Sequence, residues 1–491
     1  MGYIETLKLQ YKVIFHHVGT LFSYFSLITM IPVLFCFAYP QEWSNAIYFA
    51  ETAVISLFIG LLLRYLFTPP KNTPLTIKEG TIIVLFTWTL GIFISALPFT
   101  LSGTLNLSQA IFESTSGWTT TGLTVVDVTS VSKLILVWRS LTQFLGGAGF
   151  AIIMLSAVIG PSGFGLYHAE GRVDNIMPNI RTSVRMILVI YFTYAAGGLT
   201  AYLLAGMNFF DAFNHALTAL ATGGFSTRAG SIGEFNNPGI EVVTLVLMLT
   251  GATGFGVHYT LWSGDFKRFL KNGEPWMLLT ILLFFIPSLV KVTTRVLYPA
   301  APLRVGVFQA VSALTGTGFS TVSFDRWNDV GLYLLTLLMI FGGGMDSTSG
   351  GLKLFRLYVL ARAIWAQLTS FFRPRTTVET IILYKGQKTI EFDLRLLKEI
   401  LIIFSFYFAF YCVGVGVLAS HGYDLADSAF EYASALSTVG LSVGITRPDM
   451  PGPILWVETL GMFMGRLEFL VIFYAILKSV SYTHLTLPTK A

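Results

Sequence analysis

Four short stretches of this chain share one pattern: FESTSGWTTTGLT at 112–124, NHALTALATGGFS at 214–226, FQAVSALTGTGFS at 308–320 and FEYASALSTVGLS at 430–442. Each contains a glycine that follows a Ser or Thr by six residues and a Glu, His or Gln by nine. These glycines are Gly122, Gly224, Gly318 and Gly440. Agreement at so many aligned positions predicts a fourfold internal repeat rather than four unrelated polar loops.

The sequence around these stretches is strongly apolar. Of its 491 residues, 54% are hydrophobic and 12% are charged, about half of the roughly 25% charge that is usual in soluble domains. Apolar segments of about 20 residues are long enough to cross a bilayer core, and we expect about ten crossings. The segments are 21–38, 46–67, 81–101, 134–159, 184–206, 240–262, 276–297, 332–341, 400–418 and 454–476. Glycines interrupt 332–341, which we therefore expect to be a broken helix.

Each repeated stretch opens with about ten residues that are compatible with a helix, which at 1.5 Å per residue covers about half of the bilayer core. The stretch therefore enters the membrane and returns to the same side. We predict an all-α membrane protein in which four helix–pore-loop–helix units surround one pore with pseudo-fourfold symmetry. The predicted units are 73–165, 166–268, 269–375 and 376–480, and two extra transmembrane helices precede them in 1–72.

The distribution of Lys and Arg predicts the orientation of the chain. With the N-terminus in the cytoplasm, most of the 31 Lys and Arg residues fall on the cytoplasmic side, as is typical of membrane proteins. The largest basic run lies at 353–398, away from the aromatic residues of the membrane segments, so a nucleic-acid partner is not predicted. We expect both termini to be cytoplasmic. The polar tail 481–491 is interpreted as non-native or disordered and is left out of the function.

The filter chemistry predicted from the repeats is that of an alkali cation. Backbone carbonyl oxygens can replace the hydration water of an ion without adding full charge, and glycine tolerates the positive φ that turns consecutive carbonyls inward. The half-helix before each glycine directs its negative dipole end to the same place. The filter lacks Asp and Glu, which favours a monovalent ion over Ca²⁺. The predicted filter residues are Thr120, Thr121, Gly122, Thr222, Gly223, Gly224, Gly316, Thr317, Gly318, Thr438, Val439 and Gly440.

A polar residue precedes each filter glycine by nine positions: Glu113, His215, Gln309 and Glu431. We expect these residues to begin the half-helices and to cap them or offset their dipoles. The alternative is a role at the outer mouth, where they would attract cations. No His, Cys or acidic cluster has the spacing of a metal or catalytic site, so we predict neither an enzyme nor a metal other than the ion in the filter.

Further motifs are WRSLTQFLGGAGF at 138–150, FGGGMDSTSGGLK at 341–353 and GRLEF at 465–469. With the four filters, they resemble TrkH-type subunits of the Trk/Ktr/HKT potassium uptake superfamily over nearly the whole chain. The resemblance implies potassium uptake, because glycine at all four filter positions favours K⁺ in the family. It also implies that the protein lies in a bacterial inner membrane. The second filter, Thr222-Gly223-Gly224, departs from the common Asn-Ala-Gly. A less selective K⁺/Na⁺ channel and a sodium- or proton-coupled symporter are the alternatives.

The resemblance also implies an intramembrane loop that gates conduction below the filter. Its residues are Gly342, Gly343, Gly344, Asp346, Ser347, Thr348, Gly350 and Gly351. Asp346 stands where the family has a small residue. It is expected either to attract cations or to act structurally, by pairing with Lys353 or Arg466 or by capping the resumed helix with Ser347 and Thr348.

Two arginines also match family positions. By the resemblance, Arg466 is an electrostatic barrier below the filter, and the alternative is a structural pair with Glu468 or Glu458. Arg139 has no role that the sequence explains.

The resemblance further implies partners. TrkH-type subunits form homodimers in which each protomer holds its own pore, and they bind a cytosolic TrkA-type regulatory ring. A nucleotide (ATP, ADP or NAD) is therefore expected only through that partner, and no covalent cofactor is expected. The basic run 353–398 fits either docking of the ring or attraction to anionic membrane lipid.

Overall fold

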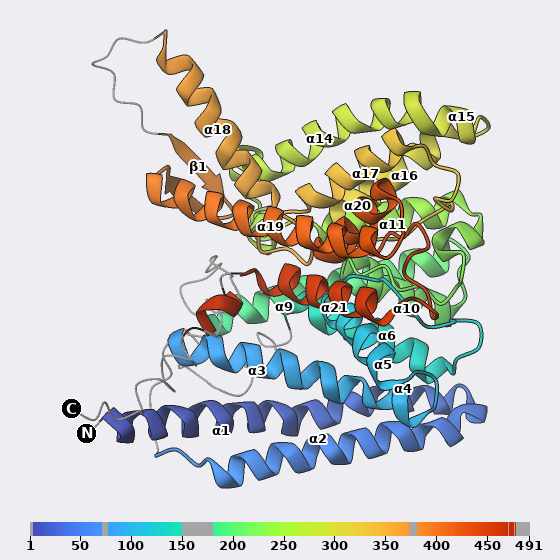
Figure 1. Cartoon of the computed structure of the whole chain (residues 1–491), viewed down its shortest axis with the longest axis vertical. Coiled ribbons are helices and arrows are strands. Elements are labelled where there is room, and N and C mark those ends of the chain that lie inside the picture. The colour runs from blue at the N-terminus through green and yellow to red at the C-terminus, as the bar shows by residue number, and fades with distance from the viewer. Residues whose placement is uncertain are drawn as a thin grey trace.

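The protein is described by a computed structural model that covers residues 3–70, 77–149, 180–372, 381–469, 471–475 and 477. Helices dominate the described part of the chain (Figure 1). The expectations for the tail 481–491, for the end of the segment 134–159 and for the unit boundaries at 72/73, 165/166 and 375/376 lie outside the described residues.

Two long helices precede the repeats, as predicted. The helices α1 (Tyr3–Thr29) and α2 (Ala46–Leu66) lie side by side and are joined by the 3₁₀ turns Ile31–Phe37 and Pro40–Asn45 (Figure 1). Gly60 makes the contact close: a methyl group on it would lie 2.5 Å from the amide nitrogen of Ser23. Small residues at such crossings let membrane helices approach each other through their backbones.

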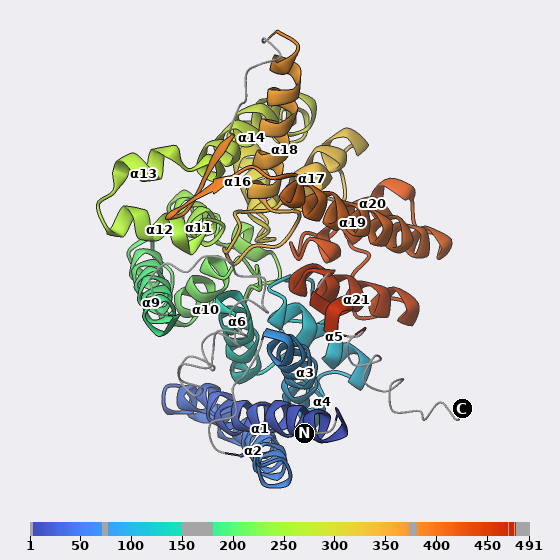
Figure 2. The same cartoon turned by 90° about the vertical axis from the view of Figure 1, so that its left-hand side faces the viewer.

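The remaining helices form four groups around a common centre, as Figure 2 shows when the molecule is viewed from one end. The first group is α3 (Ile77–Ser95), α4 (Leu97–Leu101), α5 (Leu107–Trp118) and α6 (Lys133–Ala148). The second is α9 (Ile180–Leu204), α10 (Phe209–Leu220), α11 (Pro238–Gly251), α12 (Phe255–Trp262) and α13 (Phe266–Lys271). The third is α14 (Gly273–Leu289), the π-turn Val290–Thr294, α15 (Arg295–Leu297), α16 (Pro302–Thr315), α17 (Asp329–Phe341) and α18 (Leu354–Ser370). The fourth is α19 (Leu394–Ser420), α20 (Leu425–Leu436) and α21 (Gly452–Leu467).

One short hairpin connects the third group to the fourth. Its strands β1 (Ile382–Lys385) and β2 (Lys388–Glu391) are antiparallel, with Ile382 opposite Glu391. In Figure 1 the hairpin lies at the same end of the bundle as the start of α1.

The four short helices α5, α10, α16 and α20 are the predicted half-helices, with 12 or 14 residues each. Three of them start after a side chain that accepts a hydrogen bond from the first-turn backbone: Asn106, Asn208 and Asp424. The fourth starts at Pro302, whose fixed φ suits a first helical position. Glu113, His215 and Glu431 lie seven residues after those capping residues, so the expectation that they begin and cap the half-helices is wrong.

The second helix of every group stops early. Six described helices are long and apolar enough to cross a membrane, and α11 and α12 form a pair bent by 103°. The prediction of one continuous helix over 240–262 is therefore wrong. The helices α6, α17 and α21 have 16, 13 and 16 residues. The predicted break after Phe341 is confirmed, but a similar end occurs in each group, at Gly149 (φ 74°) and Glu468 (φ 54°) as well.

Close packing of a glycine accompanies three of these ends. A methyl group on Gly146, Gly251 or Gly465 would lie 1.9–2.3 Å from the last backbone carbonyl of the half-helix in the same group. Each of these second helices is thus pressed against the base of its half-helix, which positions the segment that follows it.

Candidate functional site

The four filter segments share one backbone conformation. In each, the filter glycine and the residue two positions before it lie in the left-handed region. The φ angles are 56° and 95° for Thr120 and Gly122, 50° and 72° for Thr222 and Gly224, 66° and 81° for Gly316 and Gly318, and 52° and 99° for Thr438 and Gly440. A threonine with positive φ is strained by about 1–2 kcal/mol. The same strain at three equivalent threonines shows that the surrounding structure imposes this path.

The four segments form a closed ring. A methyl group on Gly122 would lie 2.2 Å from the carbonyl oxygen of Gly223, and one on Gly224 would lie 2.1 Å from that of Thr317. The series continues from Gly318 to the Val439 oxygen at 2.0 Å, and from Gly440 back to the Thr121 oxygen at 2.2 Å. Each glycine therefore faces the carbonyl that precedes the next glycine, and the predicted pseudo-fourfold arrangement around one axis is confirmed.

The Glu, His or Gln that precedes each filter glycine by nine positions holds the extended segment that follows the filter. The carboxylate of Glu113 accepts hydrogen bonds from the Thr124 hydroxyl and the Val125 amide, and that of Glu431 accepts them from the Ser442 hydroxyl and the Val443 amide. His215 contacts the Ser226 hydroxyl at 2.9 Å, and the Gln309 amide donates to the Thr321 hydroxyl at 3.2 Å. All four side chains are buried. The alternative of an outer-mouth role therefore has no geometric support, and these residues act as braces.

Arg139 and Gln143 on α6 link the first two filters. Arg139 donates from Nε to Glu113 Oε1 at 2.7 Å, and its other nitrogens donate to the Thr124 hydroxyl and the Ser226 carbonyl. Gln143 donates to the Gly223 carbonyl and accepts from the Phe225 amide.

A methyl group on Gly223 would lie 2.4 Å from the Gln143 side chain, which gives a local reason for the departure at this filter position. Sequence reasoning missed Gln143, although it lies within the quoted motif 138–150.

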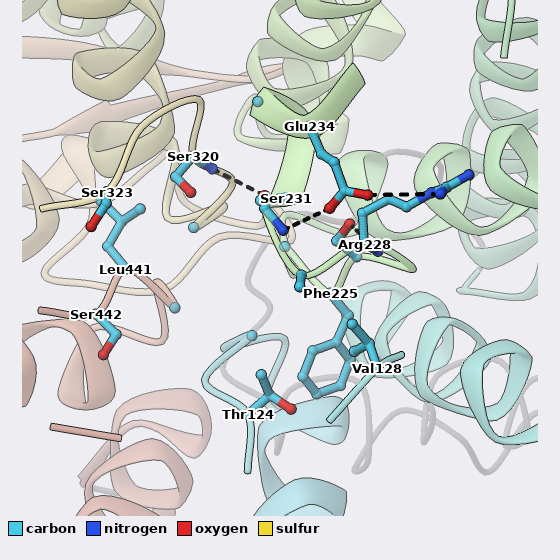
Figure 3. Close-up of a pocket in the computed structure, with 18 of the residues that line it drawn as sticks. Thr124, Val128, Phe225, Arg228, Ser231, Glu234, Ser320, Ser323, Leu441 and Ser442 are labelled. Carbon is cyan, nitrogen blue, oxygen red and sulfur yellow. Dashed lines mark hydrogen bonds and ion pairs between the residues drawn. The ribbon is translucent and has the colours of Figure 1, made fainter. Parts of the chain in front are cut away.

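A vestibule opens on the side of the filter where the four extended segments that follow the filter glycines lie. It has a volume of about 650 Å³ and is lined by residues from all four repeats, including the four filter glycines. Figure 3 shows side chains from the loops that follow the filters around this space, with Arg228 paired to Glu234 and the Ser320 amide donating to the Ser231 hydroxyl. Asp127 also lines it, and hydrogen bonds from Thr129 lower the pKa of its exposed carboxyl, so it stays negative. One cavity thus leads to all four filters.

The loop between α17 and α18 lies on the opposite side of the filter. It touches the residue two positions before each filter glycine: the Thr120 hydroxyl is 3.4 Å from the Thr348 carbonyl, and the Thr222 and Thr348 hydroxyls are 3.0 Å apart. A methyl group on Gly316 would lie 2.8 Å from the Ser349 hydroxyl, and one on Gly350 would lie 2.1 Å from the Thr438 hydroxyl. The loop therefore covers the filter ring from below.

Arg466 attaches this loop to other groups. Its guanidinium donates hydrogen bonds to the carbonyls of Thr348 and Gly146. Glu468 pairs instead with Arg356 at 2.6 Å, and Glu458 contacts Thr446. Both glutamates therefore engage other residues, and the structural pair with Arg466 stays an untested alternative to the barrier.

Asp346 is held by a residue that the sequence did not indicate. Its carboxylate lies 2.9 Å from Lys385 Nζ of the β-hairpin, and both side chains are at most 5% exposed. Lys353 instead donates to the Ser349 carbonyl. The expected pairing of Asp346 with Lys353 or Arg466 is therefore corrected, and the loop is tied to the hairpin.

The chain is similar to known transport proteins over nearly its whole length. A family model described as TrkH, cation transport protein, matches residues 46–274 and 272–483. The Trk system potassium uptake protein TrkH of Escherichia coli K12 is 31% identical over 94% of this chain and 97% of its own. An uncharacterised cation transporter of Methanocaldococcus jannaschii is 28% identical over 95% and 96%. The crystal structure of the potassium transporter TrkH from Vibrio parahaemolyticus superposes with a TM-score of 0.81 and 27% identity, over 94% of this chain and 98% of that one.

Proposed function

Because this chain belongs to the TrkH family of cation transport proteins, a multi-pass membrane family of transporters and not of enzymes, we propose that it takes up potassium ions through the ring of four filter segments. The transported K⁺ is the substrate of the pore, and we propose no covalent cofactor. Related proteins described as potassium uptake proteins support the ion, and the ring supports the path.

The observation that carries the proposal is the cyclic contact of glycines and carbonyls. Each repeat places the carbonyl before its glycine against the glycine of the neighbouring repeat, so four uncharged oxygens lie in one ring. Such oxygens bind a dehydrated alkali cation and still release it, because none carries a full charge. The four half-helices end at this ring, where their dipoles favour a cation. Potassium binding is accordingly assigned to the twelve filter residues named above.

We propose that the loop Gly342–Gly351 is the gate. It touches all four repeats directly below the filter, so an ion leaving the ring on that side meets the loop. Arg466 adds a positive charge at the same level and bonds the loop through the Thr348 carbonyl. Conduction then requires the loop and Arg466 to move together. The glycines in the loop allow such a rearrangement.

Ion preference and passive flow are tested together. The purified protein is reconstituted into liposomes that are held at a set membrane potential. The uptake of K⁺, Rb⁺, Na⁺ and Li⁺ into these liposomes is then compared. We expect K⁺ and Rb⁺ to enter faster than Na⁺ and Li⁺, with a rate that follows the potential alone. Equal entry of K⁺ and Na⁺ would support the less selective channel, for which the departure at Gly223 is the structural reason. Potassium uptake driven by a sodium or proton gradient at zero potential would identify a symporter.

We also propose the partners and the location implied by the resemblance: a homodimer in a bacterial inner membrane, with cytoplasmic termini, bound to a cytosolic nucleotide-binding subunit. Within the basic run, Arg356 and Lys385 are buried and Lys353 is half-buried, and all three are engaged inside the protein, whereas Arg373 and Arg375 lie outside the described residues. The remaining candidates for a docking surface are Arg362, Lys388, Arg395 and Lys398. Charge reversal at Arg395 and Lys398 should weaken co-purification of the regulatory subunit if they form that surface, and should leave it unchanged if they face lipid headgroups.

A further inference from the structure

Two buried glutamates face each other behind the fourth filter. Glu431 on α20 and Glu458 on α21 are both fully buried, and both contact the hydroxyl of Thr446. The hydroxyl oxygen lies 2.6 Å from Glu431 Oε1 and 3.0 Å from Glu458 Oε2. The other carboxyl oxygen of Glu458, Oε1, is buried without a hydrogen-bond partner. Two ionised carboxylates this close in a buried site would repel each other strongly.

Counting hydrogens shows where a proton must be. A threonine hydroxyl has one hydrogen, so it can donate to only one of the two carboxyl groups. Glu431 already accepts from the Ser442 hydroxyl and from the amides of Val443 and Thr446, a set of donors that favours its ionised form. The Thr446 hydrogen then completes the shorter contact to Glu431. The 3.0 Å contact to Glu458 needs a hydrogen that comes from Glu458 itself.

We propose that the cluster of Glu431, Thr446 and Glu458 is a proton-binding site, in which Glu458 carries the proton and donates it as a hydrogen bond to Thr446. Thr446 in turn donates to the Glu431 carboxylate. The ligand class is thus a single proton, bound in the wall of the filter and outside the ion path.

The first repeat provides an internal comparison. Arg139 lies seven residues before Gly146, and Glu458 lies seven residues before Gly465, so the two occupy equivalent places. Arg139 neutralises the brace Glu113 through a 2.7 Å ion pair. In the fourth repeat the equivalent residue is another acid. Glu458 can be buried next to the brace Glu431 only in its neutral, protonated form, because a second negative charge at this buried place would have no counter-charge.

The other titratable groups near this cluster offer no alternative counter-charge. Tyr432 faces Glu458 from α20, and Tyr407 and Tyr411 of α19 lie near Tyr432 rather than being linked to either glutamate. The loop residues Arg447 and Asp449 form an exposed ion pair with each other. Among the residues that the structure describes, no Lys, Arg or His forms an ion pair with Glu431 or Glu458.

Loss of the proton should disturb the fourth filter. Glu431 holds Ser442 and Val443, which lie two and three residues after Gly440. A negative charge on Glu458 would repel the Glu431 carboxylate. This repulsion would weaken the hydrogen bonds by which Glu431 holds Ser442 and Val443. If the proposed function holds, potassium flux therefore falls as pH rises through the titration of the site, by at most about tenfold per pH unit for one proton.

The flux test compares wild type with Glu458→Gln and with Glu399→Gln as the matched control, because Glu399 lies exposed on α19. Gln resembles the protonated acid and does not titrate in this range. We expect Rb⁺ uptake into liposomes to decline at alkaline pH in wild type and in the control, and to stay level in Glu458→Gln. The same decline in all three proteins would overturn the proposal.

Infrared spectroscopy tests the proton without any flux. Wild-type protein at neutral pH should show the carbonyl band of a buried protonated carboxyl group, and the band should disappear at high pH. Glu458→Gln should lack this band. Absence of the band in wild type, or a carboxylate band that shifts on adding K⁺ or Na⁺ instead, would overturn the proposal. A band that behaves as expected in a protein with no potassium uptake would refute the proposed function and keep the proton site.

Discussion

Replacing Gly440 with alanine tests whether the four filters act as one ring. The added methyl group would lie 2.2 Å from the Thr121 carbonyl oxygen of the first repeat, whereas ordinary contacts of this kind begin at 3.4 Å. The first filter must therefore yield by about 1.2 Å, which is enough to turn one carbonyl away from the ion. An interaction between a polar group and a charge contributes about 1.5–3 kcal/mol. Since about 1.4 kcal/mol corresponds to tenfold, we expect a loss of roughly 10- to 100-fold in Rb⁺ uptake.

Gly444 provides the matched control for this prediction. It lies in the same repeat with φ 95°, close to the 99° of Gly440, but no atom lies within 4 Å of its added methyl group. Gly444→Ala therefore carries only the backbone strain of about 1–2 kcal/mol. Both variants are compared with wild type in liposomes at equal protein content, after gel filtration has shown intact protein. If Gly440→Ala conducts within about twofold of Gly444→Ala, the inter-repeat contact does not control conduction and the reasoning is refuted.

Three further variants test the loop and its supports. Arg466→Ala should raise cation uptake severalfold, because it removes a charge and a bond to the loop, whereas the exposed Arg447→Ala should not; equal uptake at normal protein levels would exclude the barrier. Lys385→Met should also raise uptake, because it releases Asp346, and adding Asp346→Ala to it should have little further effect if the two residues act only as a pair. Gly465→Ala places a methyl group 1.9 Å from the Leu436 carbonyl and should lower thermal stability in detergent by about 1–3 kcal/mol; an unchanged melting curve would show that the contact relaxes freely.

The repeat was readable in the sequence because its pattern is local. The spacing of a hydroxyl, a half-helix and a glycine recurs within 13 residues, and each part of the pattern acts on its own segment. The left-handed φ of the four glycines followed from the same logic. The early ends of α6, α11 and α21 were missed, because apolar residues continue past those ends and glycines alone do not distinguish a break from close packing.

The buried polar partners were mostly not predictable. Glu113 and Arg139 are 26 residues apart along the chain. Asp346 and Lys385 are 39 residues apart, and the helix α18 lies between these two in the sequence. A buried charge is stable only when a group of opposite charge lies beside it. Many residues of opposite charge occur along the chain, and the sequence does not show which of them is the partner. The expectation for Asp346 left open whether it attracts cations or acts structurally, and the structural pair that it named had the wrong cations.

By itself, the sequence determined that four similar hairpins enter a membrane, that each carries a glycine at its turn, and that no carboxylate stands in the filter. Only the tertiary structure decided that each glycine faces the carbonyl of the next repeat, that Thr348 lies below the ring, and that Glu458 meets another acid through Thr446. The physical reason is the range of the forces involved. Hydrophobic periodicity and backbone freedom act between near neighbours in the chain, whereas ion-pair and carbonyl contacts depend on where distant helices meet once the apolar surfaces are packed.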